Sequence, residues 1–226
     1  MSPSRLRTLA LTSALVLGVG FALVFFYAPL EREGFVQKIF YLHVPLAIVA
    51  LAGFIIAAVH AIRYLRSGDP VHDARAYVSI HMSVIFGVAV LVTGAIWARA
   101  QWGVWWEWRE PTLVSFLIVF LLYCTYYPLR FAIPDRDRQA RYASVFAITA
   151  GAFVPLNFLA VRLAEPLIHP RTFSSAGGLP GEMMFTFLVC LAGVALLWTS
   201  LVSFELAAKR TRAEVGRLRR ALAEAA

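Results

Sequence analysis

The stretch from Ile39 to Ile62, IFYLHVPLAIVALAGFIIAAVHAI, contains no Asp, Glu, Lys or Arg. A helix of about 20 such apolar residues crosses the roughly 30 Å hydrocarbon core of a bilayer. Five further apolar stretches of similar length occur, at 9–27, 77–97, 112–131, 144–161 and 183–204. Hydrophobic residues make up 60% of the chain and charged residues 15%, which is far from the balance of a soluble domain. The sequence therefore predicts an all-α integral membrane protein with six transmembrane helices.

The connections between these stretches are too short for a soluble domain, so we expect residues 1–226 to form a single membrane domain. A tryptophan-rich loop is expected at about 98–111 and a basic tail at 209–226. The first stretch follows Arg5 and Arg7, as the core of a signal peptide would. It is longer than the usual core and lacks a clear small-residue cleavage site, so we expect it to be retained.

The distribution of positive charge predicts the orientation of the chain. With the N-terminus inside, 15 of the 21 Lys and Arg residues fall on inner segments and 6 on outer segments. Because cytoplasmic loops carry the excess of Lys and Arg, we expect both termini to be cytoplasmic. Contact of this basic inner side with anionic lipid headgroups accounts for the net charge of +8, so the charge does not indicate a partner that is a nucleic acid.

Four of the six tryptophans lie in one expected outer loop, WGVWWEW, at Trp102, Trp105, Trp106 and Trp108. Tryptophan is typical of places where an apolar face meets a polar edge, either as an interfacial belt or as a platform for a flat ligand. A belt spreads aromatic residues over both interfaces and many helices. The concentration in one loop therefore favours the platform.

Two histidines belong to the same outer side. His43 lies about four residues into the second apolar stretch, and His169 lies in the last outer connection. Imidazoles around an aromatic platform suit haem, because the flat macrocycle stacks on aromatic rings while its iron takes one nitrogen on each face. The remaining histidines, His60, His72 and His81, fall on the inner side.

The propionate groups of haem require cations, and a guanidinium pairs well with a carboxylate. Four basic residues lie at or near the expected outer face: Lys38, Arg109, Arg162 and Arg171. Residue types alone do not choose among them.

Other interpretations of these features stay open at this point. A histidine near a helix end also serves to satisfy a neighbouring carbonyl, and a loop histidine is often simply solvated. A subunit of a membrane transporter would carry polar residues near the middle of the bilayer, which are scarce here. A quinol-linked cytochrome b subunit would need histidine pairs on facing helices, which the loop position of His169 disfavours. Cys124 and Cys190 lie within apolar stretches and form no C-x-x-C motif, so covalent haem attachment is not indicated.

Three segments resemble the haem exporter protein C family, the haem-handling proteins of cytochrome c maturation. They are Phe40–Ala47 around His43, Thr93–Trp97 followed by the tryptophan-rich loop, and Val154–Asn157 followed by His169-Pro170. The resemblance runs from about residue 27 to residue 172. After its last tryptophan the family has an aspartate, a spacer, an arginine, a leucine and a threonine, whereas this chain reads Arg109-Glu110-Pro111-Thr112-Leu113. A tryptophan pair before the second histidine is also replaced, by Arg162 and Leu163.

The resemblance implies a role in holding and delivering haem and not an enzymatic one. His43 and His169 would be the axial ligands of a transient, non-covalent haem b, surrounded by Trp102, Trp105, Trp106, Trp108, Arg109 and Arg171. The implied partners are a periplasmic haem chaperone, an ABC-type ATPase, a second membrane subunit, a small single-span protein and membrane lipids, in the bacterial inner membrane. The chain has no G-x-x-x-x-G-K-[ST] phosphate loop, so ATP hydrolysis would take place in a partner.

Overall fold

The computed structural model describes residues 2–30, 34–163, 168–170 and 178–225. Its long helices are α1 (Pro3–Phe26), α2 (Phe40–Ser67), α3 (Pro70–Trp102), α4 (Pro111–Phe131), α5 (Arg136–Leu163) and α6 (Gly181–Glu224). A short 3-10 helix, η1 (Gly34–Ile39), leads into α2. In this described part of the chain, six helices are long and apolar enough to cross a membrane. The predicted all-α architecture with six spanning helices is confirmed.

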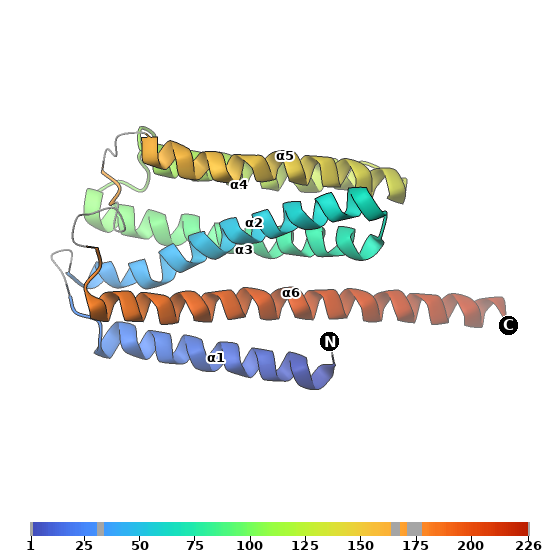
Figure 1. Ribbon diagram of the computed structural model, residues 1–226, viewed down its shortest axis with the longest axis horizontal. Helices are drawn as coiled ribbons and strands as arrows, with labels where there is room; N and C mark the ends of the chain where they lie inside the picture. The colour runs from blue at the N-terminus through green and yellow to red at the C-terminus, as the bar shows by residue number, and fades with distance from the viewer. Residues whose placement is uncertain (1, 31–33, 164–167, 171–177, 226) are drawn as a thin grey trace.

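Several helices extend beyond the apolar stretches that predicted them. α6 continues to Glu224, so the basic residues from Lys209 onward form a helix that projects past the rest of the bundle (Figure 1). Residues 98–102 form the last turn of α3, and the connection to α4 covers 103–110. Lys, Arg, Glu and Ala are good helix formers, which is why a helix persists where apolar residues stop.

Helix ends coincide with residues whose chemistry ends or starts a helix. Gly68 terminates α2 with a φ of +70°, and Asp69 begins α3 by accepting a hydrogen bond from the Val71 N–H at 2.8 Å. At the other end of α3, Gly103 adopts a φ of +75°. α4 then starts at Pro111, where the missing N–H costs nothing.

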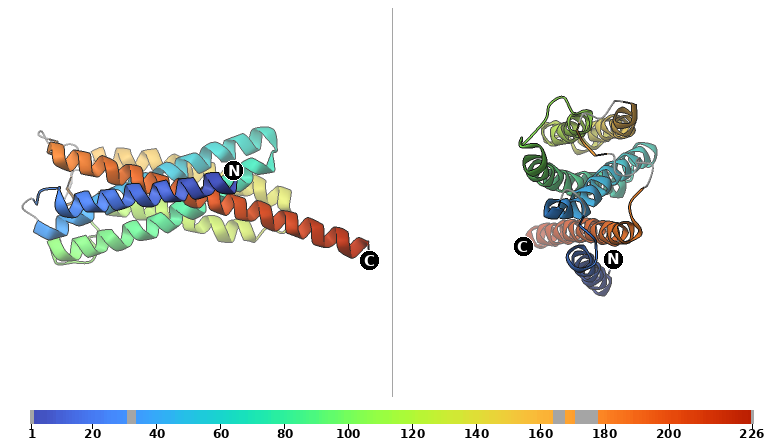
Figure 2. Two further views of the ribbon diagram at one scale, coloured as in Figure 1. Left: turned by 90° about the horizontal axis from the view of Figure 1, so that it is seen from below. Right: turned by 90° about the vertical axis from the view of Figure 1, so that its left-hand side faces the viewer.

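The helices run alternately up and down the bundle (Figure 1). α1 packs on α6, α2 on α3 and α4 on α5, and α2 also contacts α5 and α6, which makes it the central helix (Figure 2). Close packing there requires small residues. At Gly53 of α2 an added Cβ would lie 2.0 Å from the Ser83 hydroxyl of α3, so no other residue fits without a shift.

Both termini lie at one end of the bundle (Figure 1). The opposite end gathers the last turns of α1, α3 and α5 and the first turns of α2, α4 and α6. This end therefore brings together the three segments that carry the predicted histidines and tryptophans. The side of the membrane that it faces stays a prediction from the charge distribution, and we call it the outer end.

Candidate ligand cavity

A cavity of about 520 Å³ lies at the outer end, between residues of η1 and of helices α2 to α6. Its volume falls within the range of about 300–1,000 Å³ that is typical of small-molecule sites. The walls are mainly apolar and aromatic, and the aromatic members are Phe40, Trp97, Trp102, Trp106, Phe116 and Phe158. The polar members are Gln37, His43, Thr112, Asn157 and His169. The structure thus brings both outer histidines to one cavity.

The hydrogen bonds of His43 determine which of its two ring nitrogens keeps a lone pair for a ligand. Its Nδ1 lies 3.0 Å from the Thr93 Oγ1. The Thr93 hydroxyl donates its single proton to the Ala89 carbonyl at 2.7 Å, with Val90 O at 3.2 Å, so toward His43 it acts as the acceptor. His43 therefore carries its proton on Nδ1, and Nε2 keeps a lone pair for a ligand.

Gly94 makes room for this imidazole. A Cβ at position 94 would lie 2.9 Å from the Cε1 of His43, closer than real Cβ atoms approach their neighbours. The ring of His43 consequently rests against the backbone of α3, one residue beyond its hydrogen-bond partner.

His169 also carries its proton on Nδ1, but its hydrogen-bond acceptor is a backbone carbonyl. Its Nδ1 lies 3.2 Å from the Pro170 carbonyl oxygen, which only accepts hydrogen bonds, so Nδ1 is the donor and Nε2 has the lone pair. Burial lowers the pKa of His169 below its usual value, against the smaller opposing effects of Glu110 and the Pro170 carbonyl. The neutral form, which is the form that binds metals, is thereby favoured.

The tryptophans separate into two groups. Trp102 and Trp106 line the cavity together with Trp97, and Trp102 lies edge-on to the His169 ring with centroids 6.3 Å apart. Trp105 and Trp108 lie outside the cavity and are 61% and 72% exposed. The four tryptophans of the loop therefore do not form one continuous platform.

Two buried polar atoms at the cavity make no hydrogen bond within the described residues. They are the Nε1 of Trp106 and the Oδ1 of Asn157, and both residues line the cavity wall. A buried polar group without a partner costs about 1–3 kcal/mol. A ligand with polar groups of its own would remove this penalty.

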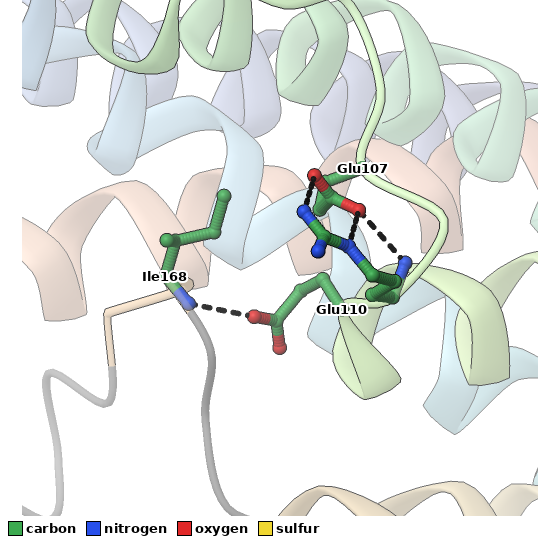
Figure 3. Close-up of polar contacts among 4 residues, drawn as sticks. Glu107, Glu110 and Ile168 are labelled. Carbon is green, nitrogen blue, oxygen red and sulfur yellow. Dashed lines mark hydrogen bonds and ion pairs between the residues drawn. The ribbon is translucent and has the colours of Figure 1, made fainter.

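The predicted cations do not line the cavity. Arg109 is exposed and pairs with Glu107, its Nε lying 3.0 Å from the Glu107 Oε1 (Figure 3). Lys38 donates to the Val24 carbonyl and, at 2.8 Å, to the Ala28 carbonyl, where it caps the end of α1. Arg162 is exposed on the last turn of α5, and Arg171 lies outside the described residues.

Glu110 is a fully buried carboxylate beside the cavity that sequence reasoning did not single out. It accepts a hydrogen bond from the backbone N–H of Ile168 (Figure 3). It also accepts from the backbone N–H groups of Thr112 and His169. Burial opposes ionisation, but these hydrogen bonds outweigh it and hold the pKa of Glu110 below its usual value. Nothing in the sequence could have paired this residue with the α5–α6 connection.

Trp97 and Asn157, which line the cavity, and Thr93, the hydrogen-bond partner of His43, are further residues of the site that the sequence did not assign individually. Thr93 and Trp97 are four residues apart on α3 and so share one face of the helix, which is a signal that their spacing contains. Asn157 carried a weaker signal, as a polar residue in an apolar stretch.

The inner histidines lie away from the cavity. The Nδ1 atoms of His60 and His72 are 3.2 Å apart, and the Nδ1 of His81 lies 3.2 Å from the Tyr127 hydroxyl. None of the three lines the cavity as the structure describes it.

Comparison with known proteins gives a consistent result along the chain. The family model for Heme exporter protein C matches residues 1–223. The Heme exporter protein C of Paracoccus denitrificans is 32% identical over 193 residues, which cover 83% of this chain and 77% of the relative. The Rhodobacter capsulatus protein of the same name is 29% identical over 195 residues, covering 84% and 78%. That of Haemophilus influenzae is 27% identical over 202 residues, covering 87% and 82%.

Proposed function

This chain belongs to the haem exporter protein C family, and we propose that its outer cavity holds haem with His43 and His169 as the axial ligands of the iron. It is a multi-pass protein of the bacterial inner membrane and a haem-handling component of cytochrome c maturation. The observation that carries the proposal is the meeting of two imidazoles from distant segments in one cavity, each with Nε2 left for a ligand.

The residues of the cavity fit haem in three respects. Aromatic walls suit a flat apolar macrocycle. Neutral imidazoles with a protonated, hydrogen-bonded Nδ1 are the form in which histidine ligates iron. The unpartnered indole N–H of Trp106 is a donor of the kind that a propionate oxygen accepts, and we assign it that role. When bound, the iron would accept one nitrogen from each histidine.

The propionates have no cation at the cavity among the described residues. Arg171 keeps the role that its sequence position implied, and Arg109 would have to leave Glu107 in order to take it. We therefore expect the propionate edge to lie toward the outer surface, where water and the loop residues solvate it.

A haem relay must also release its cargo. Cys124 and Cys190 do not line the cavity, which fits non-covalent and transient binding of haem b. We propose that Trp102 and Trp106 contact haem, whereas the exposed Trp105 and Trp108 contact the receiving haem chaperone. Delivery is binding and transfer rather than catalysis.

Membership of a haem export system implies partner proteins. We propose that they include an ABC-type ATPase, a second membrane subunit and a small single-span protein, with ATP hydrolysed by the ATPase. The alternative of a membrane subunit of a small-molecule transporter is not favoured by the family comparison.

The test compares visible absorption spectra of the detergent-purified protein with those of His43→Ala and His169→Ala. We expect a low-spin, bis-histidine spectrum in the parent, and lower occupancy or a high-spin spectrum in either variant. His60→Ala and His72→Ala are matched controls, because this pair lies at the opposite end of the bundle. A parent that stays colourless after haem is added, or a His43→Ala variant with the parental spectrum, would refute the assignment.

A further inference from the structure

We propose that Glu110 is a positioning residue for His169, which fixes this iron ligand by holding the backbone that carries it. The inference rests on the proposed function, because His169 acts as a ligand only if the cavity holds haem. Glu110 does not line the cavity, so it acts through His169 and not by contact with the cargo.

One carboxylate oxygen holds two successive backbone amides. The Oε2 of Glu110 accepts from the N–H of Ile168 at 2.9 Å (Figure 3), and also from the N–H of His169 at 3.1 Å. The Oε1 accepts from the Thr112 N–H at 3.4 Å, which ties the carboxylate to the first turn of α4. A segment 58 residues away in the sequence is thereby attached to a rigid helix end.

The attachment is strong for two physical reasons. Hydrogen bonds to an ionised acceptor are shorter and roughly twice as strong as neutral ones. The N-terminus of a helix also stabilises negative charge, and Glu110 is the N-cap of α4. Because the carboxylate is completely buried, it depends on the amides of Ile168 and His169 as much as they depend on it.

Fixing the backbone at His169 also fixes its ring. The Nδ1 of His169 is directed to the Pro170 carbonyl at 3.2 Å, and the edge of Trp102 limits the ring on another side. With the main chain and Nδ1 both held, Nε2 would be available to bind the iron in the cavity that His169 shares with His43. Residues that orient a metal ligand from behind typically change metal affinity by about 10–100-fold when they are removed.

Glu110 follows Arg109, so the carboxylate lies next to the Pro111 that starts α4. Arg109 itself is exposed and pairs with Glu107. Glu110, directly before Pro111, thus places a buried acceptor at the backbone of His169.

The experiment measures haem retention by the full-length protein in detergent for Glu110→Ala and Glu110→Gln. Haem transfer to an excess of apomyoglobin gives the dissociation rate, and the visible spectrum reports the iron ligands. We expect dissociation about 10–100-fold faster in Glu110→Ala, with a spectrum that matches His169→Ala. Added imidazole should restore the low-spin spectrum in both, because the open iron position lies opposite His43. Glu110→Gln, which keeps an acceptor oxygen without the charge, should fall between the parent and Glu110→Ala.

Glu182→Gln is the matched control, since Glu182 is exposed in the first turn of α6, at the same end of the bundle, and does not line the cavity. It should retain haem like the parent. The double variant Glu110→Ala/His169→Ala should lose haem no faster than His169→Ala, because the two residues act through one ligand. Circular dichroism shows whether each variant folds. If Glu110→Ala does not fold, the haem dissociation rate of Glu110→Gln tests the inference instead.

A folded Glu110→Gln and Glu110→Ala pair with parental dissociation rates would overturn the inference while leaving the haem site intact. Additive losses in the double variant would do the same, because they would show that Glu110 does not act through His169. A parent that binds no haem would instead refute the proposed function, so the two failures are distinguishable.

Discussion

At the scale of single residues, the partners of the two histidines matter as much as the histidines themselves. His43 is directed by the Thr93 hydroxyl, and its ring fits because position 94 is glycine. His169 is directed by the Pro170 carbonyl and held through its backbone by Glu110. One proposed iron ligand, His43, therefore lies on a helix, and the other, His169, lies on a connection between helices.

Thr93→Val should weaken haem retention by about tenfold, because valine has nearly the same shape but cannot accept the proton of the His43 Nδ1. Without this acceptor the ring loses its preferred tautomer and orientation. Thr93→Ser should behave like the parent. The dissociation rate to apomyoglobin measures the effect.

Thr149→Val is the control for Thr93→Val. Thr149 also donates to a carbonyl one turn back, that of Val145 at 3.0 Å, but it is exposed and does not line the cavity. Parental retention by Thr93→Val would show that Thr93 does not orient His43.

At the scale of helices, the inner ends of α3 and α4 are joined by a buried ion pair. The guanidinium of Arg130 binds both carboxylate oxygens of Asp73, at 2.7 and 2.6 Å, and donates to the Tyr126 hydroxyl at 3.0 Å. The side chains of Arg130 and Asp73 are only 10% and 16% exposed. A bidentate pair in such surroundings fixes the register of the two helices.

Asp73→Ala should lower stability by about 3–5 kcal/mol, because it leaves the charge of Arg130 buried without its partner. Thermal unfolding in detergent measures the loss. Replacing both residues, in Asp73→Ala/Arg130→Met, should recover much of it, since no charge then remains unpaired.

Asp137→Ala is the control for Asp73→Ala, because Asp137 is exposed and makes no ion pair within the described residues. An Asp73→Ala midpoint equal to that of Asp137→Ala would mean that the pair contributes no stability.

At the scale of the whole molecule, the chain termini lie at one end of the bundle (Figure 1), and the residues that line the cavity belong to the other end. The excess of positive charge on the terminal side predicts that this side is cytoplasmic. The cavity would then open on the periplasmic side, where a haem chaperone could reach it.

Cysteine labelling in intact cells tests this orientation. In a Cys124→Ser/Cys190→Ser background, Val104→Cys should react with a membrane-impermeant maleimide, because residue 104 is exposed in the outer loop. Ser67→Cys, at the exposed inner end of α2, should react only after the membrane is permeabilised. The reverse pattern would invert the topology and place the cavity on the cytoplasmic side.

The order of residues along the chain was sufficient to predict the class of the protein and the helices that build it. Apolar length along the chain is enough to predict a spanning helix, since each helix satisfies its own backbone within the bilayer. The six apolar stretches and the short connections between them could be predicted for this reason. The two histidines and the tryptophan-rich loop were also recognisable, because each carries unusual chemistry at one point in the sequence.

Which of these residues share a cavity depends on how the helices pack in three dimensions. Trp102, at the end of α3, and Trp106 line the cavity, whereas Trp105 and Trp108 do not. For the last three this depends on the path of the loop after Gly103. Arg109 points to Glu107, although its position allowed a role at the haem edge. Glu110 meets the His169 segment only because α4 begins beside the end of α5. Contacts between residues far apart in the chain arise from helix packing, which a one-dimensional pattern of polarity does not specify.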